Sequence, residues 1–155
     1  MSTASLNKRE LSLEKMMPVI REHLESGCDV VISPKGISML PMLRQGRDTV
    51  TLSPVKKPLK KYDIPLYRRV DGAYILHRIV STKSGYVMVG DNQFALEKGI
   101  TDEQIIAVVT SFNRGGKEYS VNGFCYKFYC RFWHYSRLFR RIWRGVLRRI
   151  KKIFS

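Results

Sequence analysis

Residues 29–41 read DVVISPKGISMLP, and the rest of the chain is organised around this stretch. Its valine- and isoleucine-rich start predicts a strand, and Pro34 with Gly36 predicts a turn where that strand ends. Ser38 follows the turn among methionine and leucine residues, which would shield its hydroxyl from water. A serine in this setting is a candidate nucleophile, and the same residues would also suit a buried serine in a turn.

The pattern on both sides of this stretch predicts a mainly β, antiparallel domain. A helix is expected first, over residues 11–24, with a kink or division at Pro18. Beyond it, short runs of β-branched and aromatic residues alternate with glycine-containing turns, which favours antiparallel strands over βαβ units. Residues 90–99 are expected to form a loop. The predicted strands cover residues 28–33, 48–52, 64–70, 73–81, 86–89 and 104–112.

The last segment, residues 124–154, differs from the rest in both pattern and charge. Apolar residues, many of them aromatic, recur every three or four positions, and arginine and lysine residues lie between them. This spacing predicts a basic amphipathic helix, with a break near Gly145. We therefore divide the chain into an N-terminal helical segment (1–27), a β domain (28–121) and a basic amphipathic tail (122–155).

The composition is that of a small folded protein with excess positive charge. Hydrophobic residues make up 44% of the 155 residues, which is too many for general disorder, and the formal net charge is +15. Beyond Arg114 the only acidic residue is Glu118, so much of the excess belongs to the tail. Such asymmetry is typical of proteins that bind an anionic membrane surface or nucleic acid.

The cysteines and the N-terminus give no indication of export. Cys28, Cys125 and Cys130 are odd in number and lack metal-ligand spacing, so we expect free thiols in a reducing compartment, no metal and no cofactor. The first ten residues lack the pattern of a signal peptide. No run reaches the ~20 apolar residues of a membrane-spanning helix. The expected location is the membrane periphery or the cytoplasm.

A nucleophilic serine needs a base, and His77 is the best placed of the three histidines. His23 lies on the predicted N-terminal helix, and His134 lies in the basic tail, where arginines would disfavour a second proton. His77 interrupts an otherwise apolar predicted strand, and an imidazole with a pKa of ~6.5 suits base chemistry near neutral pH. The alternative is a histidine within a sheet that bonds to the backbone.

Four short motifs resemble those of the signal peptidase and LexA-like superfamily of serine peptidases, and they follow the family's order. Residues 38–41 (Ser-Met-Leu-Pro) resemble the nucleophile box, and residues 59–64 resemble the next box, with Tyr62 in place of a glycine. Residues 76–80 resemble the box of the general base, and residues 90–92 (Gly-Asp-Asn) match the last box. The resemblance implies a mostly β fold and a serine endopeptidase of the histidine type found in endoplasmic-reticulum and archaeal signal peptidases.

By this resemblance Ser38 would be the nucleophile and His77 the base, with a carboxylate holding the imidazole. Asp91 matches the Gly-Asp-Asn box, and Glu97 falls near the position of a later family aspartate. Asp102 is a third candidate. Three carboxylates therefore remain open as the partner of His77.

The chain departs from the family pattern at Gly36, where signal peptidases often carry a serine that helps to bind the oxyanion. The oxyanion would then depend on backbone N–H groups near the nucleophile, including that of Ser38, with Gly36, Ile37 and Met39 as the candidate residues. The loss of one donor costs on the order of a hundredfold in rate, which weakens the chemistry without removing it.

The expected reaction is hydrolysis of a peptide bond in a signal- or leader-type peptide, after a small residue in a segment that pairs with a sheet edge. The alternative is a non-enzymatic basic protein of the same β fold that binds a membrane surface or nucleic acid. A self-cleaving LexA-like regulator is less favoured, because residues 1–27 leave no room for a DNA-binding helix pair. The tail is expected to bind an anionic membrane surface rather than a specific nucleic acid, and packing on the β domain or on a partner is its other possible role.

Overall fold

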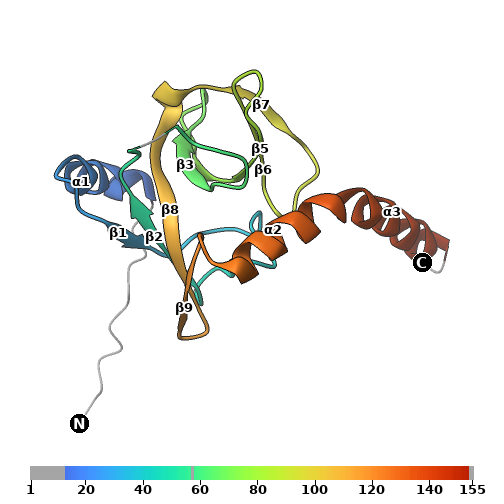
Figure 1. Cartoon of the computed structure of the whole chain (residues 1–155). Helices are drawn as coiled ribbons and strands as arrows, with labels where there is room; N and C mark the ends of the chain where they lie inside the picture. The colour runs from blue at the N-terminus through green and yellow to red at the C-terminus, as the bar shows by residue number, and fades with distance from the viewer. Residues whose placement is uncertain (1–12, 57, 154–155) are drawn as a thin grey trace, which may run out of the picture.

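The computed structural model describes residues 13–56 and 58–153, which form a β domain with helices at both ends (Figure 1). The helical elements are α1 (Leu13–Glu25), the 3-10 turn η1 (Asp102–Gln104), α2 (Phe124–Tyr135) and α3 (Arg137–Ile153). The strands are β1 (Val30–Ile32), β2 (Thr49–Ser53), β3 (Pro65–Arg68), β4 (Tyr74–Leu76), β5 (Arg78–Ser81), β6 (Tyr86–Val89), β7 (Glu97–Ile100), β8 (Ile105–Arg114) and β9 (Lys117–Ser120). The predicted mainly β, antiparallel fold with an N-terminal helix and a C-terminal helical segment is confirmed. The ends of the two predicted terminal helices, residues 11–12 and 154, lie outside the described residues.

The larger sheet is built around β8, its longest strand. The strand order is β1-β2-β8-β3-β4, and all neighbours are antiparallel. Strand β3 pairs with the first half of β8, and β9 pairs with its second half. Alternate residues of β8, among them Ala107 and Val109, are buried, as expected for a strand with one face on a core. The edge strands of this sheet are therefore β1, β4 and β9.

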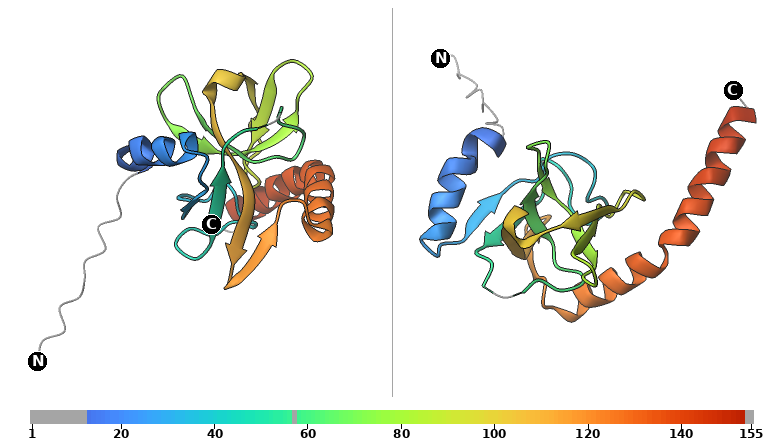
Figure 2. Two further views of the ribbon diagram at one scale, coloured as in Figure 1. Left: turned by 60° about the vertical axis from the view of Figure 1, so that its left-hand side comes forward. Right: turned by 90° about the horizontal axis from the view of Figure 1, so that it is seen from above.

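Helix α1 covers one side of this core. Met17, Ile20 and Leu24 recur at helical spacing and are buried. The helix continues through Pro18, so the expected division at that residue does not occur. Figure 2 shows α1 and α3 at opposite sides of the β domain.

The predicted strand over residues 73–81 is two strands in two different sheets. Strand β4 pairs with β3 in the larger sheet, whereas β5 pairs with β6 in a smaller sheet of order β5-β6-β7. His77 is the single residue between β4 and β5, so the candidate base lies where the chain leaves one sheet and enters the other. Strand β4 is half-buried and β5 is buried at its start, and the sequence pattern on either side of His77 carries no sign of the change of sheet.

Part of the expected loop over residues 90–99 is a strand. Strand β7 pairs with β6 through Tyr86 and Ile100 and through Met88 and Glu97. Its Glu-Lys-Gly start has little intrinsic preference for β structure. Its conformation therefore comes from pairing with β6, which a reading of local preference misses.

The basic tail forms two helices that break at Ser136 and not near Gly145. The Ser136 N–H donates to the Phe132 carbonyl, and the Arg140 N–H donates to the Ser136 carbonyl, so the hydrogen bonding continues across the break. Helix α2 packs on the β domain, while α3 passes through Gly145 and extends away from the domain (Figure 1). None of the helices in the described part of the chain is long and apolar enough to cross a membrane.

We expect Leu66→Ala to lower the free energy of unfolding by about 2–5 kcal/mol, because this β3 side chain is only 1% exposed and its loss leaves a cavity between β8 and β4. The matched control is Leu138→Ala on α3, where the side chain is 68% exposed and the expected change stays within about 0.5 kcal/mol. Urea unfolding followed by circular dichroism measures both, and equal losses would contradict the assigned core.

Candidate active site

Ser38 lies in the connection between β1 and β2, and a partly buried ion pair between Arg44 and Asp48 closes this connection. Asp48 is fully buried, and its carboxylate accepts hydrogen bonds from the backbone N–H and the guanidinium of Arg44, at 2.9 to 3.0 Å. These hydrogen bonds keep the pKa of Asp48 below its ordinary value even though burial opposes this. The contact between Arg44 and Asp48 therefore fixes the end of the segment that carries Ser38.

Gly36, one of the predicted oxyanion residues, has a backbone conformation that favours glycine. Its φ is +82°, in the left-handed region that side chains disfavour. Its N–H donates to the side-chain oxygen of Gln45 at 2.7 Å. Of the other two predicted oxyanion residues, Ile37 is exposed and Met39 is part of the hydrophobic core.

The Gly-Asp-Asn loop, residues 90–92, lies directly on the Ser38 backbone. The backbone N–H of Asn92 donates to the Ser38 carbonyl at 2.8 Å, and its side-chain amide donates to the Ile37 carbonyl at 3.1 Å. A Cβ atom on Gly90 would lie 2.6 Å from the Ser38 carbonyl oxygen and 3.1 Å from His77 Nε2. The Ser38 backbone and the His77 ring thus approach the same point, which only a glycine leaves open.

The Ser38 side chain is partly exposed, whereas the His77 side chain is only 2% exposed. Among the contacts of the described residues, no hydrogen bond joins the Ser38 hydroxyl to the His77 ring. Catalytic hydrogen bonds are often long before substrate binds and tighten in the complex. At Gly90 it is the Ser38 backbone carbonyl, and not the hydroxyl, that lies near the His77 ring.

Glu97 holds the other side of the His77 ring. Glu97 Oε1 lies 3.0 Å from His77 Nδ1. The Tyr67 hydroxyl lies 3.3 Å from the same nitrogen and gives its own proton to Glu97. Because a carboxylate only accepts hydrogen bonds and the Tyr67 hydroxyl is then an acceptor toward the ring, the proton of the neutral ring belongs on Nδ1, which leaves the lone pair of Nε2 facing Gly90. The sequence left three carboxylates open, and Glu97 is the one that contacts the imidazole.

Two residues of the β3 segment hold Glu97 in turn. The hydroxyl of Tyr67 donates to Glu97 Oε2 at 2.9 Å, and the guanidinium of Arg69 binds both carboxylate oxygens. Sequence reasoning did not single out Tyr67 and Arg69. Their two-residue spacing places them on the same face of an extended segment, but only the pairing of distant strands brings Glu97 to that face.

The pKa shifts at this site favour a neutral base beside an ionised carboxylate. Burial lowers the pKa of His77, and the nearby charge of Glu97 only partly opposes this. Burial would raise the pKa of Glu97, but hydrogen bonds from Arg69 and Tyr67 lower it below its ordinary value. Burial and then Glu97 raise the pKa of Tyr67, so its hydroxyl keeps the proton that it donates.

The two remaining candidate carboxylates are bound elsewhere. Asp91 is 4% exposed and forms a two-pronged ion pair with Arg78, at 2.7 and 2.8 Å. Asp102 accepts a hydrogen bond from the hydroxyl of Tyr86 at 2.7 Å. Of the three carboxylates that the sequence left open as partners of His77, Asp91 therefore pairs with Arg78 and Asp102 with Tyr86.

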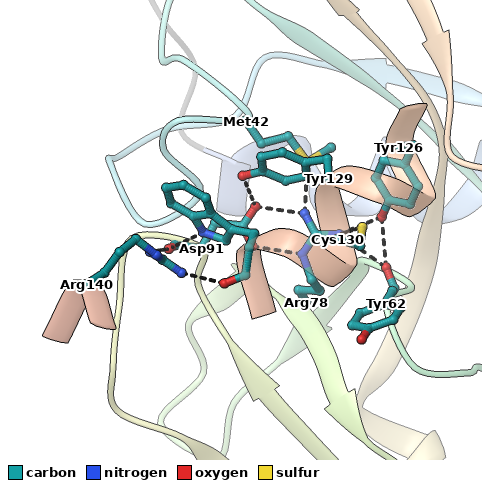
Figure 3. Close-up of polar contacts among 9 residues, drawn as sticks. Met42, Tyr62, Arg78, Asp91, Tyr126, Tyr129, Cys130 and Arg140 are labelled. Carbon is teal, nitrogen blue, oxygen red and sulfur yellow. Dashed lines mark hydrogen bonds and ion pairs between the residues drawn. The ribbon is translucent and has the colours of Figure 1, made fainter. Parts of the chain in front are cut away.

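Arg78 is the centre of a buried polar cluster that joins the β domain to α2 (Figure 3). Its guanidinium donates to the hydroxyl of Tyr126 and to the sulfur of Cys130, each at 2.8 Å, and its other side binds Asp91. Tyr129 completes the cluster by donating to Asp91 at 3.0 Å. Burial opposes the charge of Arg78, but Asp91 and the neighbouring α2 groups hold its pKa well above the ordinary value.

The C-terminal helices also bind the backbone of the loop that leads from Gly90 to Glu97. The indole N–H of Trp133 donates to the Asp91 carbonyl at 2.8 Å, and Arg140 donates to the same oxygen at 3.2 Å. Arg137 donates to the Phe94 carbonyl. The tail is thus packed on the β domain through α2 and the first turn of α3, which was one of the two roles expected for it.

Ser38 opens onto a cleft of about 550 Å³ between β1 and β4, two of the edge strands of the larger sheet. Both β1 and β4 line this cleft, and α1 contributes Leu13 and Met16 to the lining. His77 follows β4 directly, just beyond the lining residues. The residues that line the cleft are Leu13, Met16, Val31, Ile32, Ser33, Pro34, Lys35, Gly36, Ser38, Met39, Leu43, Gln45, Gly46, Leu66, Tyr74, Ile75 and Leu76.

Comparison with known proteins gives no relative from which a role could be transferred. No family model, no curated protein and no solved structure matches the chain. The chemistry of the site therefore has to be argued from its own residues and contacts.

We expect the His77 ring to titrate with a midpoint below 6.5, because burial disfavours its charged form. In Glu97→Gln the midpoint should fall further, since the variant removes the negative charge that favours the imidazolium. Two-dimensional NMR of the imidazole resonances measures both values. Glu25→Gln, at an exposed residue of α1, is the control that should leave the midpoint unchanged, and a rise in Glu97→Gln would contradict the assigned contact.

We expect Asp91→Ala to lower the free energy of unfolding by about 3–5 kcal/mol, because it leaves the Arg78 charge buried without its partner. The control is Asp29→Ala at an exposed position, with an expected change of at most about 0.5 kcal/mol. Thermal or urea unfolding measures the difference. A stable Asp91→Ala protein would show that the ion pair is not the structural contact described here.

Proposed function

We propose that the protein is a serine endopeptidase with Ser38 as nucleophile, His77 as general base and Glu97 as the carboxylate that orients the base. One observation carries the proposal: His77 Nδ1 lies 3.0 Å from Glu97, while Nε2 faces Gly90, against which the Ser38 carbonyl also lies. With the Ser38 hydroxyl turned onto Nε2, the three groups would stand in the order that acyl transfer by an activated serine requires.

In the proposed reaction His77 Nε2 takes the proton of Ser38 as its hydroxyl attacks the scissile carbonyl. The imidazolium that forms donates through Nδ1 to Glu97 and then gives its second proton to the leaving amine. In the second half of the reaction His77 Nε2 takes a proton from water as the water attacks the acyl-enzyme. The imidazolium then returns this proton to Ser38 as the ester bond breaks and the acid product leaves. The lowered pKa of His77 supports this role, because the ring is then neutral and ready to accept a proton near neutral pH.

The proposed oxyanion donors are backbone N–H groups, with that of Ser38 first among them. Gly36 is a poorer choice than the sequence suggested, because its N–H already donates to Gln45. Preorganised donors of this kind contribute roughly a hundredfold each to the rate, so the site needs no side-chain donor at residue 36 to be active.

The proposed substrate is an extended peptide that lies in the cleft between β1 and β4. An edge strand presents unpaired backbone groups to which an extended peptide adds as a further strand, and here two such edges face one cleft. The aliphatic lining from Val31, Ile32 and Leu76 favours apolar side chains in that peptide. Together with the four family-like motifs, this supports a signal- or leader-type segment as the substrate class.

We expect Ser38→Ala and His77→Ala each to reduce cleavage of a proteome-derived peptide mixture by at least about 10³-fold, because each removes a group that acts in the chemical step. Mass spectrometry of the products measures the loss and reveals the residues around the cleaved bond. Ser84→Ala and His23→Ala change the same residue types at exposed positions away from the site and should keep the parent's activity. Undiminished cleavage by either site variant would overturn the proposal.

A further inference from the structure

Helix α2 has two faces with opposite surroundings. Tyr126 and Cys130 are buried against the β domain, and Trp133 binds the Asp91 carbonyl on the same side. Phe124, Phe128 and Phe132 recur on the other side and are 82%, 64% and 60% exposed. Exposed aromatic side chains in a row at helical spacing are not explained by the packing of the domain.

Exposed apolar residues recur on α3 as well, and we call those of the two helices together the apolar stripe. Phe128 stacks on Phe132, and Phe139 stacks on Trp143, so neighbouring members contact each other along the helix surface. Every described member is at least 43% exposed. The apolar stripe consists of Phe124, Phe128, Phe132, Tyr135, Leu138, Phe139, Ile142, Trp143 and Val146.

The charges beside the apolar stripe indicate what covers it. Lys127 and Arg131 are exposed and lie one helical turn from stripe residues, and the sequence has no acidic residue after Glu118. Pairing of two copies through the stripe would bring these cations together, which disfavours a dimer. Nucleic acid would engage the cations but would leave the aliphatic members exposed to water. An anionic lipid surface satisfies both the charge and the apolar area.

We propose that α2 and α3 lie in the interface of an anionic lipid membrane, with the apolar stripe toward the acyl chains and the flanking cations among the headgroups. The helices bind along the surface and do not cross it. Because the opposite face of α2 holds Asp91, a lipid-bound α2 places the Gly-Asp-Asn loop within about 10 Å of the membrane surface. If the proposed peptidase function is correct, this position favours substrates that are themselves attached to the membrane.

The test uses the full-length Ser38→Ala protein, so that lipid binding is measured independently of peptidase activity. We expect it to sediment with vesicles of mixed phosphatidylglycerol and phosphatidylcholine, less with pure phosphatidylcholine vesicles, and less at high salt. Combined Phe128→Ser, Phe132→Ser, Phe139→Ser and Ile142→Ser substitutions should weaken binding at least about tenfold. The matched control, Val19→Ser with Val70→Ser, changes apolar residues that are exposed elsewhere and should bind like the parent.

Tryptophan fluorescence adds a measurement that locates the contact. In Trp133→Phe, Trp143 is the remaining tryptophan, and its emission should move to shorter wavelength when anionic vesicles are added. Three results would overturn the proposal. The first is that the Ser38→Ala protein does not sediment with anionic vesicles. The second is that the variant with the four serine substitutions sediments as well as the Ser38→Ala protein does, and the third is that the Trp143 emission does not shift. Concentration-dependent dimerisation that the stripe variant abolishes, or binding to RNA in place of vesicles, would assign the apolar stripe to those occupants instead.

Discussion

The buried ion pair between Arg78 and Asp91 is the contact on which the other parts of the structure depend. Arg78 follows His77 in the chain, and Asp91 lies between Gly90 and Asn92, which contact His77 and the Ser38 backbone. Joining the two charges therefore joins the candidate base to the loop beside the candidate nucleophile. Burying two charges costs several kcal/mol for each ion unless further hydrogen bonds satisfy them, and here α2 supplies these. Helix α2 thus completes the polar interior of the β domain.

Two carboxylates near His77 have opposite tasks because their surroundings differ. Asp91 is almost fully buried and faces a guanidinium, which makes it part of the framework. Glu97 is partly exposed and is shared between His77, Tyr67 and Arg69. A carboxylate held by a cation on one side can stay ionised while it accepts from an imidazole on the other. In the proposed mechanism this arrangement stabilises the imidazolium without taking its proton.

Helix α2 connects this framework to the surface of the molecule. One side of the helix completes the Arg78 cluster and binds the loop backbone, and the other side begins the apolar stripe. Any partner that binds the apolar stripe therefore binds a helix whose opposite face contacts Asp91. The proposed membrane attachment and the proposed active site are consequently neighbours across a single helix, and α3 extends the attachment beyond the domain (Figure 1).

The features that the sequence determined by itself are those encoded by local spacing. Alternation and glycine turns predicted the antiparallel strands, helical spacing predicted the amphipathic tail, and the motif order brought out Ser38 and His77 as a pair. The tertiary structure alone decided that residues 73–81 divide between two sheets at His77, and that residues 97–100 pair with β6. That pairing places Glu97 beside the imidazole of His77. Asp91 instead pairs with Arg78, and α2, which comes much later in the chain, contacts both of these residues. Periodicity reports which face of a segment is buried, but the partner of a buried charge depends on contacts between distant segments, and no local pattern records those.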